Sequence, residues 1–584
     1  MAAGQKVFQL FRSYAAGMNA AVEPAGLIRE DELALIVNGT VRNGFLETRP
    51  SFEELPLVFS GTIDQLDFIN GKYQGIGFYN LGNTKVIVVA VSGYLYFVDT
   101  ADFRVIRSPS QHFSPHSEMV WMQQRNRWFI IQDGESPPCI VDGATITQEV
   151  TPGGVPCGTF MADGWHRLVV VSPDRRRIYF SDHENDPNST PISFTEGNAY
   201  FANARFFEGP PSLGLITGIR FSPYQDSSTG IGPLVVFFEK GVRAYNVATP
   251  RSQWAITDIS QTILPNTGST SLMGYTDRGS DIMFRDHDGH IRSLRNAQQT
   301  LLNQGYNMPN DFPVWEVLRK EDATFRQFSC AATSDNRSFF AAHPYVVQNQ
   351  DGSTSVVHRC LAVLENAHVA AQRENVWTIW TGIPVAGMVE TQIAGDSSLV
   401  VFSCGDDGRN RLFRLTEHNK GDLMYTNGEP RRFRTEMQFD VGQRDFGNVM
   451  FLKAFPAAGV RLTNMGEHVT LKASWSSDAG RIDWFTHEMK RGMCLTVDKC
   501  SVFEPLPNVE ASLVLPSIPE SHAKFFKAGA RFKVQGACRV EELVFEADAV
   551  PRAKTHGIKA TPAKTNPPLK PACDLNIFSY NITA

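Results

Sequence analysis

One unit recurs along most of this chain: an apolar strand, a polar turn and a second strand. The turns carry Asp-Gly, Lys-Gly or Pro-Asp pairs, which favour tight reversals of the chain. The unit returns at spacings of roughly 40 to 65 residues, a period typical of solenoids, propellers and other repeat folds. Seven hairpins are predicted in this way, at residues 85–99, 127–143, 167–182, 233–247, 281–295, 337–365 and 398–415.

The first strand of each hairpin is apolar almost throughout, so both of its faces are expected to be buried. Stacked blades of a propeller produce that pattern, whereas a sheet with one face in water would alternate. The 40 phenylalanines, against 14 tyrosines and 9 tryptophans, also favour strands. We therefore predict an all-β chain in which residues 51–425 form an irregular β-propeller of six or seven blades.

The pattern changes after the propeller, as expected of a 584-residue chain that is too long for one core. Residues 426–550 hold longer strands with clearer alternation, which predicts a C-terminal, sandwich-like β domain. A last irregular group of blades is the alternative. Residues 551–584 form a basic, proline-rich tail that ends in an apolar strand. Such a tail is suited to strand addition on a neighbouring subunit, or is a disordered end.

Charge and cysteine usage exclude several classes of protein. The net charge of −6 argues against a basic face that grips nucleic acid, although DNA could still pass through a pore. Nine cysteines without a C-x-x-C pair indicate buried free thiols rather than disulfides or a zinc site. The longest apolar run, 86–98, is interrupted and shorter than the roughly 20 residues of a membrane helix. Residues 1–9 lack a signal-peptide core, so we expect a soluble protein made in the cytoplasm.

The sequence carries no catalytic signature in a credible setting, and we predict no enzymatic activity, cofactor or metal. Segment 286–290 (DHDGH) resembles a metal cluster, but its Asp-Gly pair predicts a solvated hairpin turn. Segment 476–484 resembles the Asp-box turn of sialidase-like propellers, with one extra residue before the tryptophan. Segment 175–177 (RRR) follows a Pro-Asp turn, and we interpret it as an exposed charged turn rather than a phosphate site.

Residues 17–50 form an irregular arm whose special residues shape its path. Glycines adopt positive φ at little cost, prolines remove backbone donors, and the Asn-Gly pairs at 38–39 and 43–44 favour hairpin turns. The apolar spacing over 27–37 predicts one short helix. We expect the arm to enter the ring before its first blade. The residues assigned to this structural and assembly motif are Gly17, Asn19, Pro24, Leu27, Asn38, Gly39, Gly44, Arg49 and Pro50.

The layout of this arm resembles the N-terminus of the nozzle proteins (tail tubular protein B) of short-tailed bacteriophages, the podoviruses. Those proteins likewise open with a Gly-hydrophobic-Ser/Asn step, followed by a proline, an Asn-Gly pair and a closing Arg-Pro. Segments 165–181, 219–245 and 281–289 are similar to virion propellers of the same group. The resemblance is carried mainly by the first 50 residues.

The resemblance implies a structural protein of the viral tail, located in the virion and synthesised in the host cytoplasm. Copies, six in a homohexameric ring, would lie below the portal and adaptor and line the DNA ejection channel. Portal and adaptor proteins would be its partners, with tail fibres or a needle as further candidates. DNA would transit the lumen without sequence-specific binding, because a mildly negative wall repels it.

Two other functions remain as alternatives. One is a virion-associated β-propeller that binds or cleaves glycans during host adsorption, for which cleavage would need a positioned pair of carboxylates. The other is a monomeric interaction propeller inside a cell. Release of reducing sugar from host polysaccharide would favour the first, and a stable monomer in the presence of portal and adaptor would favour the second.

Overall fold

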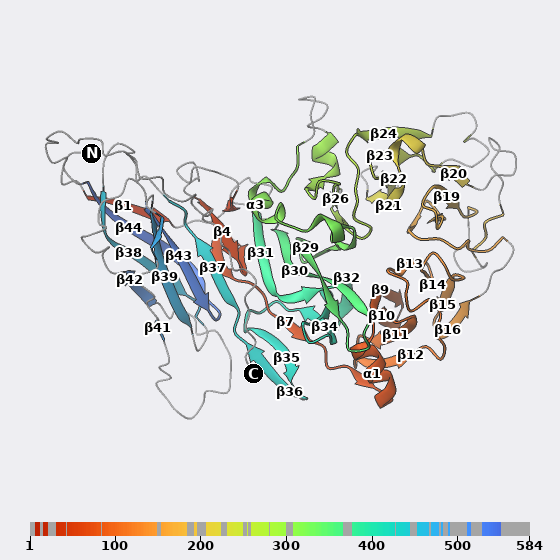
Figure 1. Cartoon of the computed structure of the whole chain (residues 1–584), viewed down its shortest axis with the longest axis horizontal. Helices are drawn as coiled ribbons and strands as arrows, with labels where there is room; N and C mark the ends of the chain where they lie inside the picture. The colour runs from red at the N-terminus through yellow and green to blue at the C-terminus, as the bar shows by residue number, and fades with distance from the viewer. Residues whose placement is uncertain are drawn as a thin grey trace.

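The computed structural model shows a mostly-β protein with many small antiparallel sheets and a few short helices (Figure 1). Its elongated body has a ring of sheets at one end and two longer sheets at the other (Figure 1). The structure describes residues 6–11, 16–20, 31–42, 44–82, 84–148, 153–183, 192–195, 206–223, 231–248, 254, 259–279, 281–298, 308–365, 376–426, 428–443, 453–465, 469–477, 480–482, 489–490, 511–515 and 528–549.

Four sheets follow one another in the first half of the chain. In spatial order, the first consists of β8 (Val58–Phe59), β12 (Arg104–Arg107), β11 (Tyr94–Asp99), β10 (Thr84–Val91) and β9 (Tyr73–Leu81). The second is β13 (Trp121–Arg125), β14 (Trp128–Gln132), β15 (Cys139–Asp142) and β16 (Thr145–Gln148). The third is β17 (Met161–Gly164), β18 (Arg167–Val171), β19 (Arg177–Phe180) and β20 (Phe206–Glu208). The fourth is β21 (Ile216–Pro223), β22 (Ile231–Phe238), β23 (Gly241–Tyr245) and β24 (Ser260–Pro265).

Three more sheets complete the series. The fifth is β25 (Tyr275–Arg278), β26 (Asp281–Arg285) and β27 (Ile291–Ser293). The sixth begins with β28 (Ala331–Ser334), β29 (Arg337–Gln348), β30 (Thr354–Glu365) and β31 (Val376–Val385). The seventh is β32 (Gly387–Ile393), β33 (Asp396–Cys404), β34 (Asn410–Leu415), β7 (Phe52–Glu54), β35 (Asp422–Thr426) and β36 (Glu429–Phe433).

The seven predicted hairpins are all confirmed as antiparallel strand pairs. They are β10–β11, β14–β15, β18–β19, β22–β23, β26–β27, β29–β30 and β33–β34.

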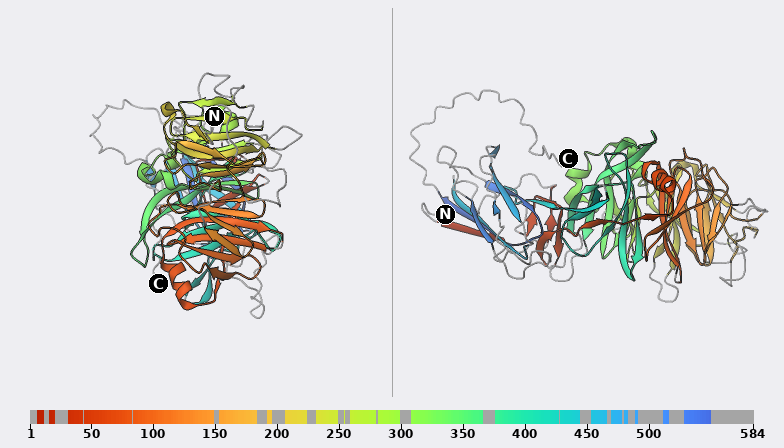
Figure 2. Two further views of the ribbon diagram at one scale, coloured as in Figure 1. Left: turned by 90° about the vertical axis from the view of Figure 1, so that its right-hand side faces the viewer. Right: turned by 90° about the horizontal axis from the view of Figure 1, so that it is seen from below.

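The sheets close into a ring (Figure 1), which Figure 2 shows from its edge, because the inner strands contact one another in sequence. Strand β9 contacts β13, β13 contacts β17, and β17 contacts β21. Contacts between β21 and β26, β25 and β28, β28 and β32, and finally β32 and β9 complete the circuit. The ring is sealed by β7, which lies between β34 and β35 although it precedes every other strand of its sheet in the sequence.

Strand β10 illustrates why the apolar strands are buried on both faces. Ile87, Val89 and Val91 pack in a core shared with the seventh sheet, and all three are fully buried. Val88 and Ala90 point to a second core, shared with the second sheet. Because each fully buried aliphatic side chain contributes about 1.5–3 kcal/mol, this stacking supplies much of the stability of the ring.

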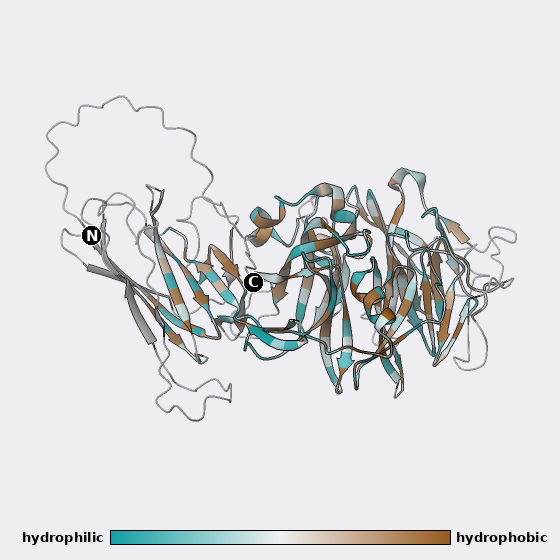
Figure 3. Ribbon diagram, turned by 60° about the horizontal axis from the view of Figure 1, so that its bottom comes forward, coloured by the Kyte–Doolittle hydropathy of each residue, from teal (hydrophilic) through white to brown (hydrophobic). Residues whose placement is uncertain are grey.

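Two larger sheets lie beyond the ring. One continues the sixth sheet from β31 through β4 (Leu35–Val37), β37 (Glu436–Asp440), β43 (Ala528–Gln535), β39 (Thr470–Ser477), β40 (Gly480–Ile482) and, beside β39, β41 (Met489–Lys490). The other consists of β42 (Ala511–Leu515), β38 (Lys453–Thr463), β44 (Arg539–Ala549), β6 (Phe45–Thr48) and β5 (Gly39–Arg42), with β1 (Lys6–Phe11) on β44. A shared apolar core lies between them, and apolar residues alternate with polar ones along their strands (Figure 3).

The arm is extended where it is described, so the helix predicted over 27–37 is wrong for residues 32–37, and residues 27–30 lie outside the described residues. Residues 32–37 form β3 (Glu32–Leu33) and β4, and β3 pairs in parallel with β2 (Gly17–Met18). The apolar run Leu35–Val37 is completely buried between two sheet neighbours, so strand pairing overrides its helical spacing. The predicted chain reversal after residue 42 is confirmed, because Arg42 pairs with Phe45 in the β5–β6 hairpin.

Helices have a minor part in the described chain. They include α1 (Thr62–Asn70), α3 (Trp315–Leu318), and the 3₁₀ turns η2 (Pro211–Leu213), η4 (Phe312–Val314) and η5 (Ala323–Phe328). Residues 294–298 are also helical. No helix in the described ranges has the length and apolar character needed to cross a membrane.

The cysteine prediction is confirmed where it can be followed. Six cysteines are described, all are free thiols, and all but the half-buried Cys157 are buried. Burial raises the pKa of the Cys139, Cys330 and Cys538 thiols to about 12. Cys494, Cys500 and Cys573 lie outside the described residues, as does the tail 551–584.

Candidate functional site

Arg49 lies at the centre of the place where the arm, the ring and the outer sheets meet. Its guanidinium is 1% exposed and holds Asp422 with two hydrogen bonds, Nη1 to Oδ1 at 2.9 Å and Nη2 to Oδ2 at 2.6 Å. It also donates to the carbonyl oxygens of Pro50 and Thr381. Asp422 begins β35 of the ring, so one arm residue is fixed to a strand 373 residues away. We call this set of contacts the arm junction.

Asn38 joins the two outer sheets at the arm junction. It lies between β4 and β5 with a φ of 55°, a left-handed conformation that asparagine tolerates better than most residues. Its amide nitrogen donates to Thr381 Oγ1 and to the Glu436 carbonyl. Its amide oxygen accepts from Arg49 Nε and from the Thr381 backbone N–H. The predicted hairpin turn at 38–39 is therefore wrong: the chain leaves one sheet here and enters the other.

Gly39 allows the neighbouring strands to approach closely. A Cβ at this position would lie 2.7 Å from Ile36 Cγ2 and 2.8 Å from Leu46 Cδ1. Its carbonyl accepts the indole N–H of the buried Trp380 at 2.9 Å. Next along the chain, Thr40 donates to the carboxylate of Glu365 at 2.6 Å. The arm is thereby bonded along its length to the sixth sheet.

A second ionic group secures β7 directly after the arm. Glu53 accepts from Arg432 at 2.6 Å and from Arg414 at 3.0 Å, and His418 Nε2 lies 3.3 Å from the same carboxylate. The hydrogen bond from His418, together with both arginines, outweighs burial and holds the pKa of Glu53 well below its usual range. Glu53 is therefore a carboxylate throughout the physiological pH range.

The remaining residues of the predicted arm motif are placed as follows. Gly17 has a φ of 69°, and a Cβ there would lie 2.6 Å from Val376 Cγ1, so a side chain is excluded. Asn19 donates to Glu32 at 3.2 Å. Gly44, with a φ of 80°, forms the β5–β6 turn. Pro24 and Leu27 lie outside the described residues.

The partners of the arm were not identified from the sequence. Asp422, Thr381 and Glu365 complete the arm junction, yet each lies more than 300 residues from its arm contact. Asp422 is a charged residue at the start of the strand β35, and the structure shows that it is buried. Buried charges are seldom left unpaired, but nothing local indicates which arginine is the partner.

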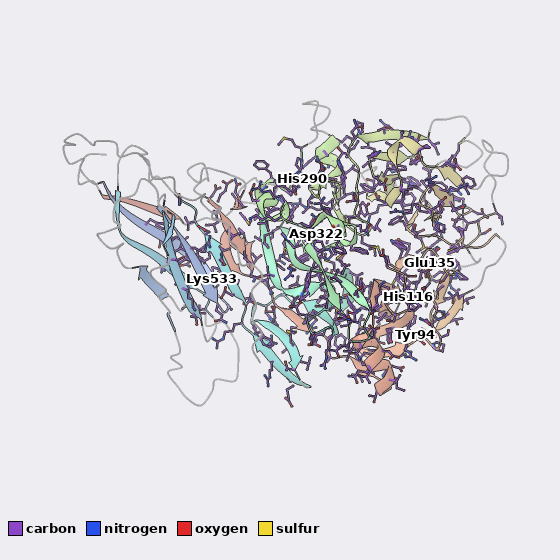
Figure 4. All side chains as sticks on the ribbon, viewed as in Figure 1. Tyr94, His116, Glu135, His290, Asp322 and Lys533 are labelled. Atoms are coloured by element: carbon purple, nitrogen blue, oxygen red, sulfur yellow. The ribbon has the colours of Figure 1, made fainter. Side chains whose placement is uncertain are left out.

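The segment 286–290 forms a turn, as predicted, between β26 and β27. It is less solvated than expected: Asp286 is fully buried and accepts the Arg292 guanidinium at 2.5 Å. His290, which is labelled in Figure 4, stacks on Trp315 with ring centroids 3.5 Å apart, and its Nδ1 contacts the buried Asp311. Within the described ranges no three His, Cys, Asp or Glu side chains gather as metal ligands would.

Two other segments were considered from the sequence, at 175–177 and 476–484. Arg176 and Arg177 are exposed and Arg175 is half-buried, and Arg177 Nε lies 3.4 Å from Glu208, as a charged surface turn predicts. In the Asp-box-like segment, Ser477 pairs with Gly480 between β39 and β40. Residues 478–479 and Trp484 of this segment lie outside the described residues.

Two cavities lie among the inner strands of the ring. One has a volume of about 540 Å³, and its lining includes Lys72 and Glu390. The other has a volume of about 310 Å³. A third cavity of about 450 Å³ adjoins the arm junction and is lined by Thr40, Arg337 and Arg539 among others. Cavities of this size are in the range of small-molecule sites.

Comparisons with known proteins identify no family. No family model matches the sequence, and no curated protein matches it. Among solved structures, "Crystal structure of BBS1N in complex with ARL6DN, soaked with mercury" is 10% identical over 63% of this chain and 98% of that chain, with a TM-score of 0.33. "Structure of the Neurospora crassa Pan2 WD40 domain" is 8% identical over 60% and 90%, also with a TM-score of 0.33. The chain thus has only distant structural similarity to β-propeller and WD40 domains.

Proposed function

We propose that this protein is a subunit of the tail nozzle of a short-tailed bacteriophage, a structural ring below the portal and adaptor. One observation carries the proposal. Asn38, Gly39, Arg49 and Pro50, which carry much of the resemblance to nozzle proteins, are buried together at the arm junction. The resemblance therefore rests on residues with a structural role and not on a scattered similarity.

In this proposal the seven sheets from β7 to β36 are the blades of a β-propeller, and the two outer sheets are an additional β-sandwich. The proposed divisions are an arm over 1–50, a propeller over 51–425, a β domain over 426–550 and a tail over 551–584. The arm contributes β4, β5 and β6 to the outer sheets, and the chain then enters the ring at β7. Because one segment belongs to both halves, they are held as one unit, as a subunit that bears load requires.

The proposed partners are further copies of this chain, six in a ring, together with adaptor and portal proteins. DNA would pass through the lumen without being bound in a sequence-specific way, consistent with a net charge of −6. The proposed location is the virion tail, and no enzymatic role is included.

Assembly state tests the proposal directly. Mass photometry of the purified full-length chain, alone and with a portal–adaptor complex, should detect a ring, and symmetry-averaged electron images should show its copy number. Gly17→Val should fail to assemble, because a β-branched side chain meets both a positive φ and Val376. Gly82→Val is the matched control, since Gly82 also has positive φ but has open space around it. A stable monomer under both conditions would contradict the proposal.

A further inference from the structure

Four of the eight large apolar side chains that are exposed among the described residues lie on adjoining elements at the outer edge of the ring. Single exposed apolar residues are ordinary, whereas a group of them marks a place where another segment or protein binds. We call this group the first-sheet patch. Its members and their exposed fractions are Val58 (55%), Ile63 (71%), Leu66 (51%) and Ile106 (60%).

The patch is formed by β8, β12 and α1, the last of which is seen at the edge of the ring (Figure 1). Val58 pairs with Arg104, two residues before Ile106, so Val58 and Ile106 point to the same face of the first sheet. Ile63 and Leu66 are three residues apart on α1 and share one side of this helix. Helix α1 follows β8 directly and contacts it.

Helix α1 is only partly packed against the ring. Phe68 is its one buried residue, and it packs edge-on against Tyr96 with ring centroids 5.1 Å apart. A helix of nine residues is not stable by itself in water and depends on the packing of its apolar side chains. Because Ile63 and Leu66 are more than half exposed, the side of α1 that carries them is open to a further segment.

The surroundings of the patch carry an excess of negative charge. Helix α1 contains Asp64 and Asp67 and no basic residue. Arg107 of β12 binds both carboxylates, with Nε 3.1 Å from Asp64 Oδ1 and Nη1 2.5 Å from Asp67 Oδ2. Two carboxylates therefore share one guanidinium, and Asp67 is still half exposed. A segment that is apolar and positively charged suits this surface.

The chain itself contains such a segment. Residues 51–425 hold 29 Lys and Arg against 39 Asp and Glu, a net charge of −10, whereas residues 1–50 and 426–550 are each neutral. The tail 551–584 holds five Lys and Arg against one Asp, a net charge of +4. The overall charge of −6 thus combines an acidic ring with a basic tail. The last lysine of the tail, Lys570, is followed by the apolar residues Leu575, Ile577, Phe578 and Tyr580.

The tail starts far from the patch of its own chain. Strand β44 ends at Ala549 in the outer sheets, whereas α1 lies on the ring, at the other end of the body (Figure 1). The roughly 28 residues from Ala549 to Ile577 span up to about 90 Å when extended, enough to reach a neighbouring copy. A head-to-tail contact of this kind forms a ring when its rotation closes.

We propose that the apolar residues 575–582 of one copy pack on the first-sheet patch of the next copy, while the tail lysines face Asp64 and Asp67. This inference rests on the ring proposed above, because it requires a second copy.

Photo-cross-linking of the full-length chain tests this contact. A benzophenone amino acid replaces Gln65, which is exposed on α1, and isotope-labelled and unlabelled copies are mixed before assembly. Irradiation should join position 65 to residues 551–584, and mass spectrometry should find cross-links between one labelled and one unlabelled chain. Leu66→Arg should lower the yield about ten-fold, because it removes an apolar contact and adds a charge of the tail's own sign.

Met308→Arg is the matched control, because Met308 is 45% exposed but lies outside the patch, and its yield should stay unchanged. The inference would be overturned by the absence of a cross-link to the tail, by tail cross-links within single chains only, or by an equal yield with Leu66→Arg. Because the cross-linked segment is identified with Leu66 intact, a Leu66→Arg variant that fails to fold leaves the first two results decisive.

Mass photometry of the same samples separates this inference from the ring proposal. Rings that form without a cross-link to the tail would contradict the tail contact alone. A stable monomer would contradict the ring and the tail contact together.

Discussion

Two buried arginine–carboxylate pairs hold this molecule together in different ways. Arg49 and Arg285 are each 1% exposed, and each binds a carboxylate through its two terminal nitrogens, Nη1 and Nη2. Arg49 reaches Asp422, 373 residues away, whereas Arg285 reaches Glu321, 36 residues away. Glu321 is also bound by Arg326 Nε and by the His343 backbone N–H, both at 3.0 Å.

The difference lies in what remains when the arginine is removed. Asp422 would keep the backbone N–H of Phe52 at 2.9 Å, but it would lose the cation that faces it. Glu321 would keep a guanidinium, because Arg326 approaches from a second side. The ionic attachment of Arg49 to β35 thus rests on one ion pair, whereas Glu321 within the ring has a second cation in Arg326.

The largest expected effect is at the arm junction. Arg49→Met should lower the free energy of unfolding by about 3–5 kcal/mol, because it leaves the Asp422 carboxylate buried without its cation. Urea unfolding measures this. Arg177→Ala, which removes an exposed arginine paired with Glu208 at 3.4 Å, is the control and should cost under about 1 kcal/mol. Equal costs for the two variants would contradict the role of Arg49.

The ring pair lies near histidines, so this region should respond to pH. His358 is fully buried on β30, and burial lowers its pKa to about 4 from 6.5. Between these values the unfolded chain binds a proton that the folded chain does not. Stability should therefore fall as the pH drops from 6.5 to 4, by about 3 kcal/mol in total at roughly 1.4 kcal/mol per unit.

Urea unfolding across this pH window measures the effect, and His358→Phe should reduce its slope. If the variant and the unchanged protein lost stability in parallel, another group would be responsible.

Arg285→Met sharpens the comparison. Because Arg326 remains on Glu321, its expected cost is about 2 kcal/mol, below the usual range for a broken buried pair. The double variant Arg285→Met/Arg326→Met should lose more than the sum of the two single changes, which a double-mutant cycle measures. A cost at Arg285 above that at Arg49 would reverse the contrast between the two regions.

The smallest expected effect is at the hairpin turns. Gly44→Ala and Gly82→Ala each place a side chain at positive φ, 80° and 60° respectively, in a two-residue turn. Each should cost about 1 kcal/mol in thermal or urea unfolding. A much larger cost at Gly44 would show that the arm junction also constrains its neighbouring turn.

Features could be predicted from the sequence where the interacting residues lie close together along the chain, and not where they lie far apart. The hairpins were predictable because strand, turn and partner lie within a few tens of residues, as Val86 and Asp99 show. The arm was not, because Leu35 to Val37 are strand only through neighbours β31 and β37, hundreds of residues away. Arg49 belonged to a noticeable Arg-Pro pair, but its chemical role requires Asp422, and no local pattern joins the two.

The strand β4 also sets how the molecule should respond to a pulling force. On its outer side it pairs with β37 at three positions, Leu35, Ile36 and Val37. On its ring side the ladder to β31 has one pair, Val37 with Ile379. Tension between the two ends of the molecule would concentrate at that single strand pair, so the first rupture is expected between β31 and β4. The side-chain contacts of Arg49 and Asn38 should then set the force that this rupture requires.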